Sequence, residues 1–391
     1  MCLQVNIIQR HGARYPTEGA SLGIAVALQK LKSASIYLDH RLDFLREYEY
    51  SLGTNDLLPL GALESYTAGV IQYERYRHLI DVDHLPFIRA DGSERVVHSA
   101  FNWSNGFSWA SNGEYQPDAP LIISPKLNNT LTNKMCPNAK EDQEQCDTWL
   151  AYYAIPVAER LNEAAPGALL TAADIPYLMS LCAFEAVAAS ATSQSFCNLF
   201  EDSEFEGYEY YQDLAKYYSF GYGQKLGRVQ GVGYVNELLA RLTGEPVRDN
   251  TQTNRTLDSS PATFPFNRTL YVDFSHDNTM VTIYAALGLF EELDPLNPHV
   301  PDPKRGWVLS RMVPFAGRMV TEKLQCLTST RPGRSAGMSM AQYVRIMVDD
   351  EVQPLKFCGA AENGLCELSA FVTSQAYARA DGEGDFEKCF P

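Results

Sequence analysis

A short basic segment near the start of the chain, QRHGARYPTEG, places a histidine between two arginines. The planar guanidinium groups of Arg10 and Arg14 suit bidentate contact with phosphate oxygens. Two cations beside an imidazole favour its neutral form, which leaves a nitrogen lone pair on His11 for nucleophilic attack. Gly12 permits a close approach of the backbone. The segment therefore predicts a phosphate-binding loop with a histidine nucleophile rather than a solvated basic turn.

A second segment, FSHDN, follows a strand-like run and opens a helix-like run. The N-terminus of a helix attracts anions through its free N–H groups and its dipole. His276 is placed to donate a hydrogen bond to phosphate, and Asp277 to protonate a leaving group. The dipole and the arginines oppose proton release by lowering the pKa of Asp277, whereas bound phosphate and an acidic medium favour it. The alternative is that this segment is only an ordinary helix cap.

The elements that must position these segments can be read from hydrophobic spacing. A short strand over 3–8 precedes the first segment, and a longer strand over 268–274 precedes the second. The middle of the chain is rich in helix-like spacing up to Tyr222. Further elements are predicted as follows: helices over 18–46, from Gly61, over 231–244 and over 275–288, and strands over 318–326 and 343–355.

This order of elements predicts an α/β fold, with a mixed β-sheet flanked by helices and an inserted, mainly helical smaller domain. The α/β domain is expected to consist of 1–35 and 223–391, the first and last parts of the chain. The helical insertion is expected over 36–222, partly returning to the α/β domain around 121–135. With 391 residues, the chain is long enough for two such units.

The composition limits the classes of partner. A formal net charge of −16 argues against nucleic-acid binding, which requires a basic face. No run of 18 uncharged apolar residues occurs in the sequence, so no membrane span is expected. An acidic protein repels anions at long range, so an anion site in this chain must be a local basic pocket.

Nine cysteines accompany four N-x-S/T sequons, a combination typical of a secreted, disulfide-bonded glycoprotein. The cysteines lack C-x-x-C and zinc-type spacing, so no metal site is expected. The chain opens inside a strand-like run without a signal peptide, which suggests a trimmed N-terminus. The predicted glycosylation sites are Asn102, Asn128, Asn254 and Asn267.

The motif RHGARYP combined with a distant SHD resembles the histidine acid phosphatases, and the secreted fungal phytases in particular. The segments QGVGYVNELLARLT, TLDSSPATFPFNRTLYVDFSHDN, VQPLKFCG and EKCFP extend the resemblance over essentially the whole chain. The resemblance implies a secreted, extracellular enzyme that hydrolyses phytate to lower inositol phosphates through a phosphohistidine, at acidic pH. It also implies that neither a metal nor a cofactor is needed, because guanidinium groups stabilise the phosphate charge. We expect a monomer.

The resemblance assigns roles to individual residues. His11 matches the nucleophile and Asp277 the proton donor. Arg95 matches a further phosphate-binding arginine, although the residues alone do not distinguish it from Arg89. The expected phosphate-binding set is Arg10, Arg14, Arg95 and His276.

The resemblance also implies four disulfides, which the spacing of the cysteines does not select. The ninth cysteine, Cys146, is left as a buried thiol or an intermolecular link. The implied pairs are Cys2–Cys326, Cys136–Cys389, Cys182–Cys197 and Cys358–Cys366.

The outer part of the expected pocket has few lysines. Glu18 follows the first motif, the next lysine along the chain is Lys30, and Phe220 stands where some relatives have a polar histidine. Lys216 is therefore the candidate residue for phytate specificity, and a broad-specificity acid phosphatase is the alternative within the family. Two further alternatives are a cytosolic phosphomutase and a non-catalytic secreted glycoprotein that binds phosphorylated ligands.

Overall fold

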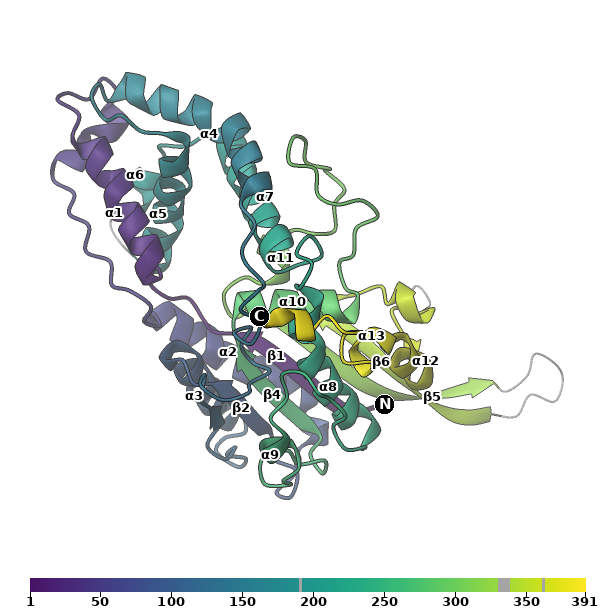
Figure 1. Cartoon of the computed structure of the whole chain (residues 1–391). Helices are drawn as coiled ribbons and strands as arrows, with labels where there is room; N and C mark the ends of the chain where they lie inside the picture. Colours follow the sequence, from purple (N-terminus) through teal and green to yellow (C-terminus); the bar gives the residue numbers. More distant parts are fainter. Residues whose placement is uncertain (190–191, 330–337, 361–362) are drawn as a thin grey trace.

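The computed structural model of the chain describes residues 1–189, 192–329, 338–360 and 363–391. Its strands form one mixed sheet with helices on both faces, and a second group of helices lies to one side of the sheet (Figure 1). This arrangement confirms the predicted α/β fold with a mixed sheet flanked by helices. Within the described residues, no helix has the length and apolar character needed to cross a membrane.

Eight strands form the sheet: β1 (Cys2–Arg10), β2 (Phe87–Asp91), β3 (Leu121–Ile123), β4 (Leu270–Ser275), β5 (Arg318–Ser329), β6 (Met338–Val348), β7 (Glu351–Val352) and β8 (Cys366–Glu367). Their order is β3-β2-β4-β1-β5-β6-β7, and β8 pairs with β6. β1 to β4 pair with one another in parallel, whereas the pairs that involve β5 to β8 are antiparallel. β1 is thus the strand where the parallel half meets the antiparallel half.

The central strand β1 is buried on both faces from Gln4 to Gln9, although its sequence alternates polar and apolar residues over most of this length. Ile7 packs into the core formed with the two helices on one face, and Ile8 packs into the core on the other face. The flanking helices are α2 (Pro59–Tyr76) and α3 (Glu94–Ala110) on the first face, and α8 (Val232–Thr243) and α10 (Asp277–Leu287) on the second.

Helix ends follow the local sequence closely. Gly244 ends α8 and Gly288 ends α10, each with a positive φ that a glycine adopts without a steric penalty. Both ends were predicted. Four short helices complete this part of the fold: α9 (Arg255–Asp258), α11 (Leu309–Met312), α12 (Leu368–Ser374) and α13 (Ala376–Arg379).

The remaining helices share an apolar core of their own beside the sheet (Figure 1). Leu28, Leu45, Leu161, Leu178 and Phe196 lie in this core, each at most 4% exposed. The helices are α1 (Glu18–Lys32), the 3-10 helix η1 (His40–Arg46), α4 (Glu144–Ala164), α5 (Ile175–Val187) and α6 (Ser193–Cys197). The first half of α7 (Asp202–Ser219) borders this core, whereas its buried Tyr210, Leu214 and Tyr217 lie in the core on the second face of the sheet.

These contacts do not follow the predicted domain boundaries. α1 packs against α5 in the helical core although it falls within 1–35, whereas α2, β2 and α3 belong to the sheet layers although they fall within 36–222. The cause is that the chain passes between the two parts several times, and hydrophobic spacing does not reveal which core an amphipathic helix joins. The division of the chain into two domains remains a prediction.

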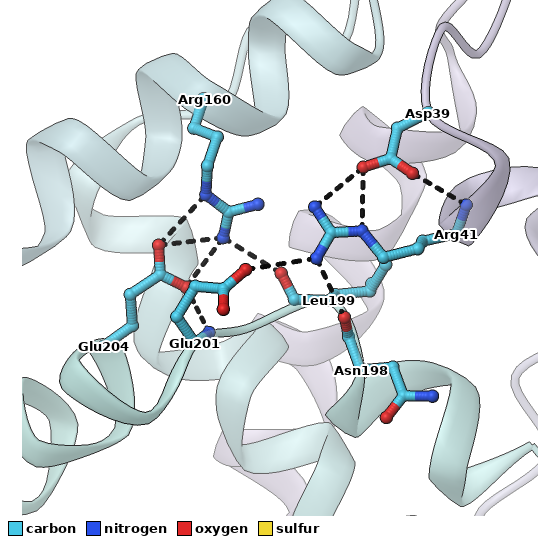
Figure 2. Close-up of polar contacts among 7 residues, drawn as sticks. All are labelled: Asp39, Arg41, Arg160, Asn198, Leu199, Glu201 and Glu204. Atoms are coloured by element: carbon cyan, nitrogen blue, oxygen red, sulfur yellow. Dashed lines mark hydrogen bonds and ion pairs between the residues drawn. The ribbon is translucent and has the colours of Figure 1, made fainter.

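A polar network holds the start of α7 against α4 (Figure 2). The side chain of Glu204 accepts the backbone N–H of Glu201 (2.9 Å) and also pairs with Arg160 of α4 (2.7 Å). Arg41 donates to Asp39 (2.9 Å) and pairs with Glu201 (3.3 Å). The network fixes the direction of α7, whose last turn lies beside the sheet.

Several predicted boundaries are wrong for physical reasons. The helix predicted over 18–46 ends at Lys32, and only a separate 3-10 helix follows it. The strand predicted over 343–355 is a tight hairpin, because Asp349 and Asp350 both adopt positive φ and reverse the chain between β6 and β7. β2 was not predicted, because its five residues are too few to show a period.

Three of the four predicted disulfides are confirmed, namely Cys136–Cys389, Cys182–Cys197 and Cys358–Cys366. The predicted bond between Cys2 and Cys326 is wrong, since both are free thiols in the structure. Cys2 lies opposite Leu324 in the β1–β5 pair, so Cys326 occupies a diagonal position. Diagonal pairs are about 7–8 Å apart, beyond the usual span of a disulfide. Cys146 is a buried free thiol, which is one of the two predicted outcomes.

A buried ionic cluster joins β2, β4, α8 and α9. Arg89 donates to Asp273 (2.7 Å) and to Glu237 (2.6 Å), and Arg241 donates to Asp273 (2.7 Å). Asp258 lines the same small cavity as Arg89 and Glu237, and its Oδ2 is buried without a donor among the described residues. Two guanidinium groups thus face three carboxyl groups, so the cluster is neutral when one carboxyl keeps its proton. Burial, followed by the charge of Glu237, raises the pKa of Asp258 to about 8.

Asp258 should therefore make the free energy of unfolding depend on pH. Its pKa is raised on folding from 3.8 to about 8, so the folded state holds a proton that the unfolded state has lost between these values. Its contribution is fully present below pH about 4 and declines as pH rises to about 8. Urea unfolding should show that the free energy of unfolding decreases less between pH 5 and pH 8 for Asp258→Asn than for wild type.

The control for this experiment is Asp147→Asn, which changes an exposed aspartate. Because Asp258→Asn creates the sequon Asn-Ser-Ser, both variants should be made in a host that does not glycosylate. If the free energy of unfolding decreases equally in wild type and Asp258→Asn between these pH values, Asp258 does not hold the proton.

Candidate active site

The ends of three neighbouring parallel strands form the site. β2, β4 and β1 lie side by side, so their carboxyl ends meet at one edge of the sheet. His11 follows β1 directly, His276 follows β4 and is the N-cap of α10, and Asp91 ends β2. Arg95 lies in the first turn of α3, just after β2. The two segments singled out in the sequence are therefore brought together.

His11 is buried, with 1% of its surface exposed, and its backbone N–H donates to the carbonyl of Ser275 (3.1 Å). Its Nδ1 lies 2.9 Å from the carbonyl of Gly12. Because a carbonyl oxygen only accepts, Nδ1 carries the hydrogen and Nε2 keeps its lone pair. Burial, followed by the charges of Arg10 and Arg14, lowers the pKa of His11 well below 6.5. The ring is therefore neutral and nucleophilic.

The loop around His11 rests on the first turn of α2. A Cβ atom on Gly12 would lie 2.1 Å from the carbonyl oxygen of Gly61, and one on Gly61 would lie 2.1 Å from the oxygen of Ala13. Both positions thus require glycine. Glu64 accepts the N–H of Ala13 (2.7 Å), and Ser99 accepts the N–H of Gly12 (3.1 Å). These contacts fix the loop before any ligand binds.

Two arginines lie beside the imidazole of His11. Arg10 pairs with Asp277 (3.3 Å) and donates to the carbonyl of Val313 (2.6 Å). Arg14 donates to the carbonyl of Tyr15 (2.7 Å). Burial, followed by the charge of Arg10, lowers the pKa of Arg14 to about 10, so it remains a cation in acidic and neutral solution. The group provides the local basic pocket that an acidic protein needs to bind an anion.

His276 is held between a carboxylate and a guanidinium. Its Nε2 lies 2.9 Å from Asp91, and its Nδ1 lies 3.4 Å from Nη2 of Arg95. Burial opposes ionisation of Asp91, but hydrogen bonds from His276 and Ser93 bring its pKa below 3.8. Asp91 therefore accepts from Nε2 and orients the ring, which leaves Nδ1 facing the arginines.

Asp277 begins α10 and is 23% exposed. Burial favours its neutral form, but the charges of Lys216 and Arg10 outweigh burial and hold its pKa well below 3.8. In the ligand-free protein Asp277 is a carboxylate. Asp277 can act as an acid only after it gains a proton. This requires a bound anion that replaces the carboxylate as the partner of Lys216 and Arg10.

Lys216 comes from the last turn of α7 and also pairs with the candidate proton donor. Its Nζ lies 3.2 Å from Asp277, contacts the side-chain oxygen of Asn278, and sits 5.2 Å from the centre of the Phe220 ring. Lys216 was predicted only as a residue for phytate specificity. Because Lys216 also pairs with Asp277, it lowers the pKa of the candidate proton donor as well.

Sequence reasoning missed three neighbours of these residues: Asp91, Glu64 and Phe315. Asp91 was detectable in principle, because a polar residue at the end of a parallel strand is a common position for function. Glu64 lies within a helix, and Phe315 lies in a turn before β5. Neither shows a local sequence signal.

The predicted glycosylation sites remain predictions. Asn128 and Asn267 are exposed, whereas Asn102 and Asn254 are half-buried. Asn254 caps α9 through the N–H of Leu257 (3.3 Å) and donates to the carbonyl of Asn128 (3.4 Å), so two of the sequons adjoin. In the part of the chain that the structure describes, no three His, Cys, Asp or Glu side chains are grouped as metal ligands.

The neutral state of His11 can be measured in the ligand-free protein. NMR of histidine-labelled protein should show a neutral imidazole for His11 at pH 5, where an ordinary histidine is charged. Arg14→Met removes one cation and should raise this pKa by about one pH unit. Arg379→Met, which changes an exposed arginine on α13, should leave it unchanged. Titration of His11 near 6.5 in the wild type would contradict this account of the site.

Known proteins resemble this chain over most of its length. The curated Phytase A of Penicillium oxalicum is 40% identical over 405 residues, covering 98% of this chain and 85% of the relative. Phytase A of Aspergillus oryzae is 37% identical over 402 residues, covering 98% of this chain and 84% of the relative. The crystal structure of the phytase from D. castellii has the same fold, with a TM-score of 0.77, 23% identity, and coverage of 99% of this chain and 81% of that one.

The sequence profile of the histidine phosphatase superfamily (branch 2) matches residues 3–349. This range includes both strand ends that carry the site, with His11 after β1 and His276 and Asp277 after β4. The chain therefore belongs to the histidine phosphatase superfamily, branch 2.

Proposed function

We propose that this protein is a phytase, which hydrolyses phytate to lower inositol phosphates and phosphate through a phosphohistidine. The observation that carries the proposal is the neutral, buried His11, whose free Nε2 is surrounded by arginines and lies near a carboxylate. The relatives named Phytase A support phytate as the substrate.

In the first step, Nε2 of His11 attacks phosphorus opposite the leaving oxygen. A bond from nitrogen to phosphorus forms, and the bond from phosphorus to the inositol oxygen breaks. Arg10, Arg14 and Arg95 stabilise the negative charge on the phosphate oxygens. Asp277, protonated once phosphate has drawn Arg10 and Lys216 away, gives its proton to the leaving oxygen.

In the second step, water attacks the phosphohistidine. Asp277, now a carboxylate, takes a proton from the water while the bond from phosphorus to nitrogen breaks. Phosphate leaves, His11 returns to its neutral form, and Asp277 again carries a proton. As Arg95 turns toward phosphate, Nδ1 of His276 is freed and, when protonated, donates to a phosphate oxygen.

We also propose that the protein acts outside the cell, as a monomer. Its three disulfides suit an oxidising compartment, and the sequons at Asn128 and Asn267 are exposed for modification. The relatives' names support a phosphate ester as its small-molecule partner.

Activity on two substrates, phytate and p-nitrophenyl phosphate, distinguishes the role of His11 from that of Asp277. At pH about 5, His11→Ala should abolish phosphate release from both phytate and p-nitrophenyl phosphate, because no nucleophile remains. Asp277→Ala should lower kcat for phytate by about 10²-fold or more, and for the aryl ester far less, because nitrophenolate leaves without a proton.

His40→Ala is the control for these variants, since His40 is fully exposed and far along the chain from both segments. The mechanism is wrong if wild type and His11→Ala are both active on phytate, or both inactive.

Lys216 should favour phytate over simple monoesters. A cation beside Asp277 can reach a second phosphate of a polyphosphate, which an aryl monophosphate lacks. Lys216→Ala should therefore raise KM for phytate more than KM for p-nitrophenyl phosphate, whereas Lys216→Arg should preserve the preference. Equal increases for both substrates would show that Lys216 does not distinguish phytate from simple monoesters and would favour a broad acid phosphatase.

A further inference from the structure

A five-residue turn before β5 is attached to the loop that carries the nucleophile. The N–H of Ala316 donates to the carbonyl of His11 (3.0 Å), and the carbonyl of Gly317 accepts the N–H of Arg10 (2.8 Å). The carbonyl of Val313 accepts Nη1 of Arg10 (2.6 Å). Three hydrogen bonds thus join the turn to two consecutive residues of the site.

The turn has an unusual backbone at its centre. Ala316 has a φ of 53°, in the left-handed region that residues with a Cβ atom seldom adopt. Its hydrogen bond to His11 and the bond from the N–H of Gly317 to Pro314 (3.0 Å) hold this conformation. The result is that the preceding side chain, Phe315, points at the site.

The ring of Phe315 lies close to the two arginines and the histidine of the RHGAR motif. The ring centre is 4.5 Å from Cζ of Arg10 and 5.9 Å from Cζ of Arg14. The imidazole of His11 lies 6.1 Å from the ring, centre to centre. Nε of both arginines is buried without an acceptor among the described residues, so the aromatic ring is a neighbour of two incompletely hydrogen-bonded guanidinium groups.

An aromatic ring suits this place better than other side chains. A carboxylate would neutralise the arginines and compete with phosphate, whereas an aliphatic group would not attract them. The face of an aromatic ring attracts both guanidinium groups and carries no net charge that a phosphate must displace. It therefore offsets cation repulsion in the empty site without lowering the affinity for an anion.

We propose that Phe315 is a positioning residue, which holds Arg10 and Arg14 in their phosphate-binding orientation while the site is empty. The proposal rests on the phosphate chemistry inferred above. It assigns Phe315 no contact with the reacting atoms.

The test compares side chains that keep or remove the aromatic face. Calorimetry with inorganic phosphate at pH about 5 should show about tenfold weaker binding for Phe315→Leu and Phe315→Met, since two cation contacts are lost. Phe315→Tyr keeps the face and should bind within twofold of wild type. With p-nitrophenyl phosphate, KM of Phe315→Leu should rise more than its kcat falls, a split that general loosening of the fold would not produce.

Phe266→Leu is the control, because it makes the same change at an exposed phenylalanine away from the motif. Wild-type phosphate affinity in both Phe315→Leu and Phe315→Met would overturn the proposal, as would a loss in Phe315→Tyr equal to that in Phe315→Leu. Phosphate binding is measured without turnover, so a wild type that binds phosphate but leaves phytate intact would contradict the proposed function and not the role of Phe315.

Discussion

Repulsion between cations is the constraint on which the site depends. Arg10 and Arg14 lie beside one neutral imidazole, and the carboxylate of Asp277 pairs with Arg10 and Lys216 in the ligand-free state. These cations stay close together only if the backbone segments that carry them are held in place. Hydrogen bonds from β1 to the neighbouring strand end and turn, and the contact between two glycines beneath the loop, provide that rigidity.

The same repulsion makes phosphate part of the electrostatic balance. Without phosphate, the cations keep Asp277 ionised, and burial together with Arg10 and Arg14 keeps His11 unprotonated. Bound phosphate takes the place of Asp277 as the partner of these cations, which frees the carboxyl group to hold a proton. The exchange of partners that binds the substrate therefore also prepares Asp277 to act as an acid.

The chemistry of the site could be predicted from the sequence to a large extent, because RHGARYP and SHD each combine rare residue types at fixed spacing next to a strand. Residues that act through others could not be predicted in this way. Phe315 owes its position to the backbone of Ala316, and the link between Lys216 and Asp277 depends on how α7 packs. In the fold, helix ends at glycines were predictable, whereas the membership of α1 in the helical core was decided by long-range packing.

The separate core of the helical part has a consequence for how this protein can diverge. Most of these helices pack on one another, whereas α7 packs on both parts: Phe205 and Tyr208 lie against the helical core, and Leu214 and Tyr217 lie in the core on the second face of the sheet. Substitutions inside the helical core can shift α1, α5 and α6 without disturbing β1, β4 or the loops after them, but the half of α7 that carries Lys216 is held in a core shared with Ile8 of β1. Selection can therefore vary the helical part while the phosphoryl-transfer machinery is inherited unchanged, but the position of Lys216 is tied to that machinery.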